Sequence, residues 1–132
     1  MTDSPPTVLV VEDEQELRDE LLELLAMRGF GVLGASSVEE ALHLLRRPPG
    51  PITLLSDLRL SGGSGLDLVR RIAADAELGA NVVRTLLMTG HTDLTEQVER
   101  ELARYGVAML FKPVQTVRLL SLLKGATEEA AR

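Results

Sequence analysis

Hydrophobic residues follow two alternating patterns along this chain. Short apolar runs rich in Val, Leu and Ile are typical of strands that a parallel sheet buries on both faces. Between these runs, apolar residues recur every three or four positions, which is typical of helices with one buried side. The predicted strands are Thr7–Val11, Phe30–Ala35, Ile52–Ser56, Val82–Met88 and Val107–Phe111.

Helices are predicted after each of these strands. The segment Ser36–Glu40 has the spacing of a capping box, which starts a helix, and Gly29 is a stop signal for the helix before it. The helices are expected at Glu14–Arg28, from the capping box to Arg46, around Leu66–Ala73, at Leu94–Tyr105 and at Gln115–Lys124. Parallel neighbours need crossover connections, so this alternation predicts an α/β fold, a doubly wound five-stranded parallel sheet with helices on both faces.

Composition narrows the classes of protein that fit this pattern. The length of 132 residues fits one domain. A net charge of −6 disfavours direct nucleic-acid binding, because that affinity depends on cationic contacts. The absence of cysteine excludes disulfides, thiolate catalysis and cysteine-ligated zinc. We see no signal peptide and no apolar run long enough to span a bilayer, and we expect a cytoplasmic protein that does not bind membranes.

Polar residues with phosphoryl-transfer chemistry follow the predicted strands. Glu12 and Asp13 come directly after the first strand, and Asp57 comes after the third. Thr89 follows the fourth strand and Lys112 follows the fifth. The carboxyl ends of parallel strands meet at one edge of the sheet, where ligands bind.

This set of side chains favours a particular reaction. Carboxylates that converge repel one another unless one is protonated or a hard cation binds them. Oxygen ligands suit Mg²⁺, which also accepts a phosphate as ligand. A lysine and a hydroxyl at the same edge would neutralise and position the transferred oxygens. A carboxylate is then the natural nucleophile.

Four segments together resemble a known family. The segments VLVVEDE, LLSDLRLSGGSGLDLVRRI, LLMTGH and LFKPV occur in the order and spacing of the CheY-like receiver domains of two-component response regulators. The resemblance covers the chain from Thr7 to Lys124. It implies a flavodoxin-like fold of five βα units with strand order 2-1-3-4-5. We accordingly expect a disordered segment at residues 1–6, a receiver domain at residues 7–124 and a C-terminal tail at residues 125–132.

The resemblance also implies roles for the residues at the strand ends. It makes Asp57 the phosphoacceptor in a Mg²⁺-dependent reaction. Asp13, Asp57 and the backbone carbonyl of Arg59 would bind the Mg²⁺, and Glu12 would act partly through water. Two further residues, Thr89 and Lys112, would contact the phosphoryl oxygens.

Partners follow from the same resemblance. A sensor histidine kinase or a histidine phosphotransfer protein would donate the phosphoryl group, and a downstream effector protein or domain would respond. The domain would catalyse its own phosphorylation and its own dephosphorylation without being an enzyme in the usual sense. The fourth and fifth predicted helices would form the surface for targets and for a homodimer.

The chain departs from the family pattern at a few positions. Met109 stands where the family has a Tyr or Phe that takes part in the switch, although a flexible Met could repack. Ser61 replaces a typical proline, and Gly63 and Ser64 replace a bulkier and an acidic residue, so we expect a more mobile loop after Asp57. We hypothesise that the output surface is altered.

Other interpretations stay open at this point. Asp57 could cap the following helix, and the acid pair could be a solvated helix start. Lys112 could be a surface charge, and Thr89 is a good strand residue in any case. A haloacid-dehalogenase phosphatase would need a second Asp at the position of Arg59, and an FMN carrier would not place acids after its first strand. A pseudo-receiver without phosphorylation is also compatible, and the chain is either a complete regulator or part of a longer protein.

Overall fold

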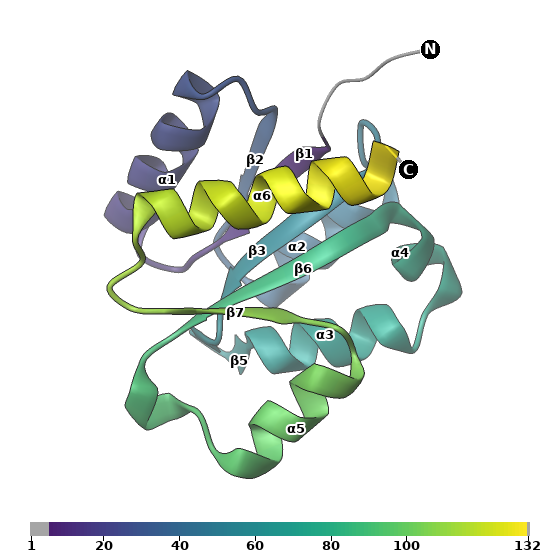
Figure 1. Ribbon diagram of the computed structural model, residues 1–132. Coiled ribbons are helices and arrows are strands. Elements are labelled where there is room, and N and C mark those ends of the chain that lie inside the picture. Colours follow the sequence, from purple (N-terminus) through teal and green to yellow (C-terminus); the bar gives the residue numbers. More distant parts are fainter. Residues whose placement is uncertain (1–5, 132) are drawn as a thin grey trace.

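A computed structural model describes residues 6–131, which form a parallel sheet between two layers of helices (Figure 1). The sheet has five strands in the order β2-β1-β3-β6-β7, and all neighbouring pairs are parallel. Counted along the chain within this sheet, the order is 2-1-3-4-5, which confirms the predicted fold class. The strands are β1 (Thr7–Val11), β2 (Val32–Ala35), β3 (Ile52–Asp57), β6 (Val82–Thr89) and β7 (Ala108–Phe111).

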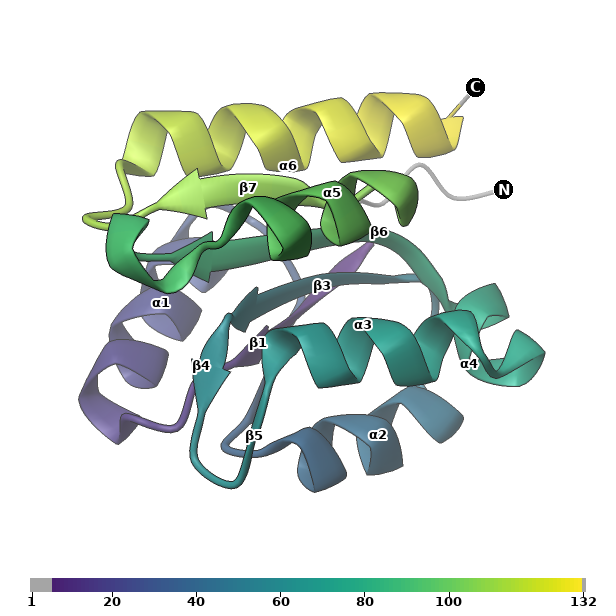
Figure 2. The ribbon, with the colours of Figure 1, turned by 90° about the horizontal axis from the view of Figure 1, so that it is seen from below.

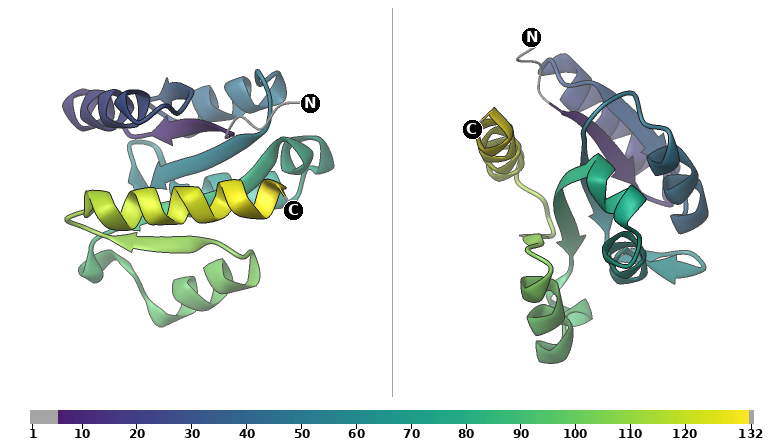
Figure 3. Two further views of the ribbon diagram at one scale, coloured as in Figure 1. Left: turned by 45° about the horizontal axis from the view of Figure 1, so that its top comes forward. Right: turned by 90° about the vertical axis from the view of Figure 1, so that its right-hand side faces the viewer.

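Helices cover both faces of this sheet. The helices are α1 (Gln15–Met27), α2 (Val38–Arg46), α3 (Gly65–Ala73), α4 (Ala76–Asn81), α5 (Glu96–Arg104) and α6 (Thr116–Ala131). Helices α1 and α6 pack on one face around Val10, Leu25 and Leu119, and α6 crosses in front of the sheet in Figure 1. Helices α2, α3 and α4 pack on the other face with α5 beside α3. The edge strand β7 lies between α6 and α5 (Figure 3).

The central strand β3 carries the deepest part of the core. All residues from Ile52 to Asp57 are buried, because β1 and β6 flank the strand and helices cover both of its faces. An apolar run of this kind is typical of the middle of a doubly wound sheet. Its last residue, Asp57, is thus a carboxylate at the end of a strand that water does not reach from either face.

The structure contains two elements that the sequence analysis did not predict. A short hairpin, β4 (Arg59–Leu60) paired with β5 (Gly63–Ser64), forms inside the loop after Asp57 (Figure 2). Helix α4 lies between α3 and β6, where the sequence analysis named no element. The Asp75 side chain accepts the N–H groups of Glu77 and Leu78 and caps this helix. A helix of six residues is too short to show a periodic pattern.

Some predicted ends also differ. Thr95 caps α5 by accepting the Val98 N–H at 3.2 Å, so α5 begins two residues after the predicted Leu94. A 3₁₀ turn, η1 (His91–Asp93), precedes it. Helix α6 was predicted to end at Lys124 but runs to Ala131, since Ala and Glu favour helix.

The described part of the chain has no helix with the length and apolarity that crossing a bilayer requires. Of the segment expected to be disordered, residues 1–5 lie outside the described residues, and Pro6 is buried. The domain limits at residues 7 and 124 stay predictions.

Candidate functional site

The strand register brings the predicted acidic residues together. Val11 lies opposite Ser56 in the β1/β3 pair, so Glu12 and Asp57 follow at the same level of the sheet. Both carboxyl groups are buried, with Glu12 2% exposed and Asp57 6% exposed. The sequence therefore places two carboxylates side by side at an edge with little access to water.

The predicted lysine lies at the same edge. Thr89 lies opposite Phe111 in the β6/β7 pair, and the Lys112 N–H donates to the Thr89 carbonyl at 2.9 Å. The Lys112 Nζ donates to Asp57 Oδ2 at 2.6 Å. The Arg59 N–H donates to the other oxygen, Asp57 Oδ1, at 3.2 Å. The carboxylate of Asp57 is thus held by one cation and one backbone donor.

The charges around Lys112 keep it protonated. Burial alone would lower the pKa of Lys112, but the hydrogen bond and the charge of Asp57, with the charges of Glu12 and Asp93, outweigh burial and raise it. A permanent ammonium group at this place can neutralise negative charge that develops on an oxygen bound to Asp57.

Glu12 has an unusual protonation equilibrium. Burial, with smaller contributions from the charge of Asp57 and the side chain of Asp13, raises the pKa of Glu12 from 4.5 to about 7. The Glu14 N–H donates to Glu12 Oε2 at 3.2 Å and acts in the opposite direction. Burial, aided by the neighbouring carboxylates, therefore lets Glu12 hold a proton over part of the neutral range.

Asp13 is held by the loop that follows Asp57. Both the N–H and the hydroxyl of Ser61 donate to Asp13 Oδ2, each at 2.8 Å. These bonds lower the pKa of Asp13. The sequence analysis noted Ser61 only as a replacement for proline. A proline has no N–H, and this difference was the available signal that Ser61 contacts a neighbouring acceptor.

Thr89 is buried at the same edge, but its hydroxyl donates to the carbonyl of Gly90 at 3.0 Å. A phosphoryl contact by Thr89 would need this hydroxyl to rotate. Met109, the departure at the switch position, packs against the cluster of Leu58, Leu66 and Leu102.

The structure adds Asp93 to the site, a residue that the sequence analysis did not select. Arg59 NH1 lies 3.1 Å from Asp93 Oδ1. Asp93 belongs to η1, which follows the strand that ends at Thr89. Its position shortly after the end of β6 was a signal that it could belong to the site. The turn between them prevented a prediction of where its side chain points.

The donors present fit a hard divalent cation. Among the described side chains, no three from His, Cys, Asp and Glu are grouped as ligands of one ion. The expected set needs only two carboxylates, Asp13 and Asp57, with the Arg59 carbonyl, and Mg²⁺ keeps several waters. After burial, the charge of Asp57 also contributes to the raised pKa of Glu12, and a bound cation would offset that charge.

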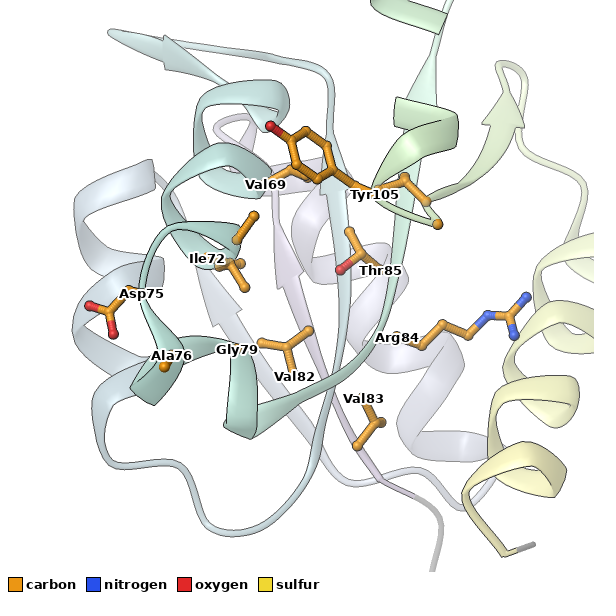
Figure 4. A pocket seen from close by; sticks show the side chains of 13 residues that line it. Val69, Ile72, Asp75, Ala76, Gly79, Val82, Val83, Arg84, Thr85 and Tyr105 are labelled. Atoms are coloured by element: carbon orange, nitrogen blue, oxygen red, sulfur yellow. The ribbon is translucent and has the colours of Figure 1, made fainter. Parts of the chain in front are cut away.

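A cavity lies in another part of the molecule, away from the candidate site. A cavity of about 640 Å³ lies at the amino end of β6, between α3, α4 and the residue Tyr105 (Figure 4). Figure 4 shows the Arg84 guanidinium pointing away from it, toward α6. The acidic residues of the candidate site, Glu12, Asp13, Asp57 and Asp93, do not line this cavity. The candidate site is therefore identified by the chemistry of its side chains and not by the volume of a cavity.

Comparisons with known proteins agree with the fold and identify the family. A family model for the response regulator receiver domain matches residues 8–124. The transcriptional regulatory protein FixJ of Bradyrhizobium diazoefficiens is 31% identical over 125 residues, which make up 93% of this chain and 57% of that protein. The C4-dicarboxylate transport transcriptional regulatory protein DctD of Rhizobium meliloti is 31% identical over 94% of this chain and 26% of that protein. The chain thus spans about half or less of these regulators.

Solved structures give the same result. A response regulator receiver protein from Pseudomonas putida is 34% identical with a TM-score of 0.80, over 92% of this chain and 98% of that chain. A response regulator receiver domain protein from Clostridium thermocellum is 26% identical with a TM-score of 0.80, over 96% and 97%. These matches decide against the phosphatase and FMN-carrier interpretations. The chain belongs to the response regulator receiver domains of two-component systems.

Proposed function

We propose that this domain accepts a phosphoryl group on Asp57 in a Mg²⁺-dependent reaction and reports it through a changed interaction surface. The observation that carries the proposal is the buried Asp57 carboxylate, held at 2.6 Å by the Lys112 ammonium beside the buried carboxyl group of Glu12. A nucleophile, a fixed cation and a divalent-cation site are the parts that phosphoryl transfer requires.

The transfer step is a displacement at phosphorus. A carboxylate oxygen of Asp57 attacks the phosphorus of a phosphohistidine on a sensor kinase or phosphotransfer protein. The P–N bond breaks, and its electron pair stays on the imidazole, which then takes a proton from water. Lys112 moves from Asp57 Oδ2 to a phosphoryl oxygen and neutralises part of its charge. The Thr89 hydroxyl turns from Gly90 to donate to another phosphoryl oxygen.

The divalent cation has a defined place in this scheme. Asp13, Asp57 and the Arg59 carbonyl would hold Mg²⁺, with Glu12 acting partly through water. When bound, Mg²⁺ supplies charge neutralisation for the transferred oxygens. The loop residue Ser61 fixes the position of the Asp13 side chain through its two donated bonds, and it thereby competes with the ion for Oδ2.

The same edge would limit the life of the phosphorylated state. Water attacks the phosphorus, the bond to the Asp57 oxygen breaks, and Asp57 leaves as a carboxylate while the water proton passes to solvent. Inorganic phosphate is the product. The domain would therefore reset itself without a separate phosphatase.

We also propose the partners that this role requires. The donor is a sensor histidine kinase or a histidine phosphotransfer protein, and the target is an effector protein or domain. The relatives are transcriptional regulatory proteins of which this chain covers a part. We place this domain in the cytoplasm, assign no direct nucleic-acid contact to it, and assign target binding and homodimerisation to the surface of α5 and α6.

Incubation with acetyl phosphate and Mg²⁺, followed by intact mass, tests the proposal. Wild type should gain one phosphoryl group, and Asp57→Asn should gain none. Asp67→Asn removes an exposed carboxylate on α3 and is the matched control, which should behave as wild type. Chelation of Mg²⁺ should stop the reaction. A phosphoryl group on Asp57→Asn, or none on wild type, would overturn the assignment.

A further inference from the structure

An ion pair joins the loop after Asp57 to the segment after β6. Arg59 NH1 lies 3.1 Å from Asp93 Oδ1. The Arg59 side chain is 78% exposed, whereas the Asp93 side chain is 25% exposed. The backbone of the same arginine donates to Asp57 Oδ1 at 3.2 Å. Arg59 thus contacts the acceptor with its main chain and Asp93 with its guanidinium.

Asp93 interacts with two cations of the site, Arg59 and Lys112. Besides its contact with Arg59, its charge contributes to the raised pKa of Lys112. The Asp93 N–H donates to the Gly90 carbonyl at 3.1 Å, which fixes the turn that carries it. In the unphosphorylated protein, the Asp93 carboxylate is therefore paired with Arg59, a cation that would otherwise attract a phosphoryl group on Asp57.

A phosphoryl group on Asp57 changes this balance of charge. It brings about −1.5 to −2 charges near Arg59, Lys112 and Asp93. It attracts the two cations and repels the carboxylate. A guanidinium binds phosphoryl oxygens with two parallel bonds, and an exposed ion pair is weak, so the exchange costs little.

We infer that Asp93 is a positioning residue that holds the Arg59 guanidinium until Asp57 is phosphorylated, when Arg59 exchanges Asp93 for the phosphoryl oxygens. This inference rests on the proposed function. It gives Arg59 a side-chain role in addition to the role of its carbonyl, and it gives the segment before α5 a direct connection to the acceptor.

The structure leaves room for the released segment to move. A cavity of about 560 Å³ lies beside the ion pair, lined among others by Leu58, Leu66, Asp93 and Val98. A second ion pair also holds α5 to α3, with Arg70 bound to Glu101 at 2.7 and 2.8 Å. Exchange at Arg59 would therefore release the turn η1, which precedes α5, while the Arg70–Glu101 pair keeps α5 attached to α3.

The test is a double-mutant cycle on the rate of phosphorylation by acetyl phosphate with Mg²⁺. Asp93→Asn frees Arg59 to attract the anionic donor, and we expect the rate to rise about threefold, a size suited to an exposed pair. The rate of this variant should also fall more steeply with added NaCl. In an Arg59→Gln background, Asp93→Asn should change the rate by less than about 1.5-fold, because the partner is gone.

Glu101→Gln is the matched control, because it breaks an ion pair of α5 away from the acceptor and should leave the rate unchanged. If Asp93→Asn changes the rate equally in both backgrounds, Asp93 does not act through Arg59 and the inference is overturned. If Asp93→Asn has no effect while wild type is phosphorylated, the inference falls and the proposed function stands. If neither wild type nor any variant is phosphorylated, both fall.

Discussion

Gly65 at the start of α3 has no space for a side chain. A Cβ built there would lie 2.6 Å from the backbone oxygen of Asp57 and 3.0 Å from Leu87 Cδ2. The Gly65 N–H also donates to the Leu58 carbonyl at 2.8 Å, so the chain cannot simply move outward. The nearest atom is backbone in a buried strand, and Gly65→Ala must displace either α3 or the end of β3.

We expect Gly65→Ala to lower the free energy of unfolding by about 2 kcal/mol, within the range for overpacked interiors. With a urea m-value of about 2 kcal/mol/M, the midpoint of urea denaturation should fall by about 1 M. The displaced backbone is that of Asp57, so phosphorylation by acetyl phosphate should also slow by about tenfold or more.

Gly50→Ala is the control for this prediction. No atom lies within 4 Å of a Cβ at Gly50. The free energy of unfolding of Gly50→Ala should therefore match that of wild type within about 0.5 kcal/mol. Equal midpoints for Gly65→Ala and Gly50→Ala would refute the steric argument. A destabilised Gly65→Ala that is phosphorylated at the wild-type rate would refute the connection to Asp57.

Further predictions concern the charged edge and a helix cap. The folded pKa of Glu12, about 7, exceeds the ordinary 4.5, so without divalent cations stability should fall as pH rises from about 4.5 to 7, and urea titrations should show a flatter profile for Glu12→Gln. Lys112→Met leaves the acids without their ammonium and should cost about 1–3 kcal/mol at pH 8; an equal cost at pH 5, where Glu12 is protonated, would contradict this. Ser37 accepts the Glu40 N–H at 3.1 Å, and Ser37→Ala should cost about 1 kcal/mol in urea denaturation, whereas an unchanged midpoint would show that the cap contributes nothing.

The sheet and its acidic edge could be predicted because the signals are local and repeated. The buried strand that ends at Asp57 reads as an apolar run, and parallel strands must place their carboxyl ends together. The capping box at Ser37 was also visible, although Glu40 reaches back to the Ser36 N–H at 2.6 Å rather than to that of Ser37.

The parts that were missed depend on contacts between distant segments. The bonds from Ser61 to Asp13 and from Arg59 to Asp93 join residues 48 and 34 positions apart. No periodic pattern encodes such pairs, because only the folded sheet brings their loops together. The length of α6 was missed for another reason, since Gly125 resembles a stop signal but lies within the helix.

The two hydrogen bonds that Ser61 donates to Asp13 have a consequence for metal affinity. The oxygen that two donors already hold, Asp13 Oδ2, is less available to a cation than a carboxylate facing open water. Metal binding would then depend on the geometry of the β4–β5 hairpin. A substitution in that loop would change the Mg²⁺ concentration that the domain requires, although every acidic residue is kept.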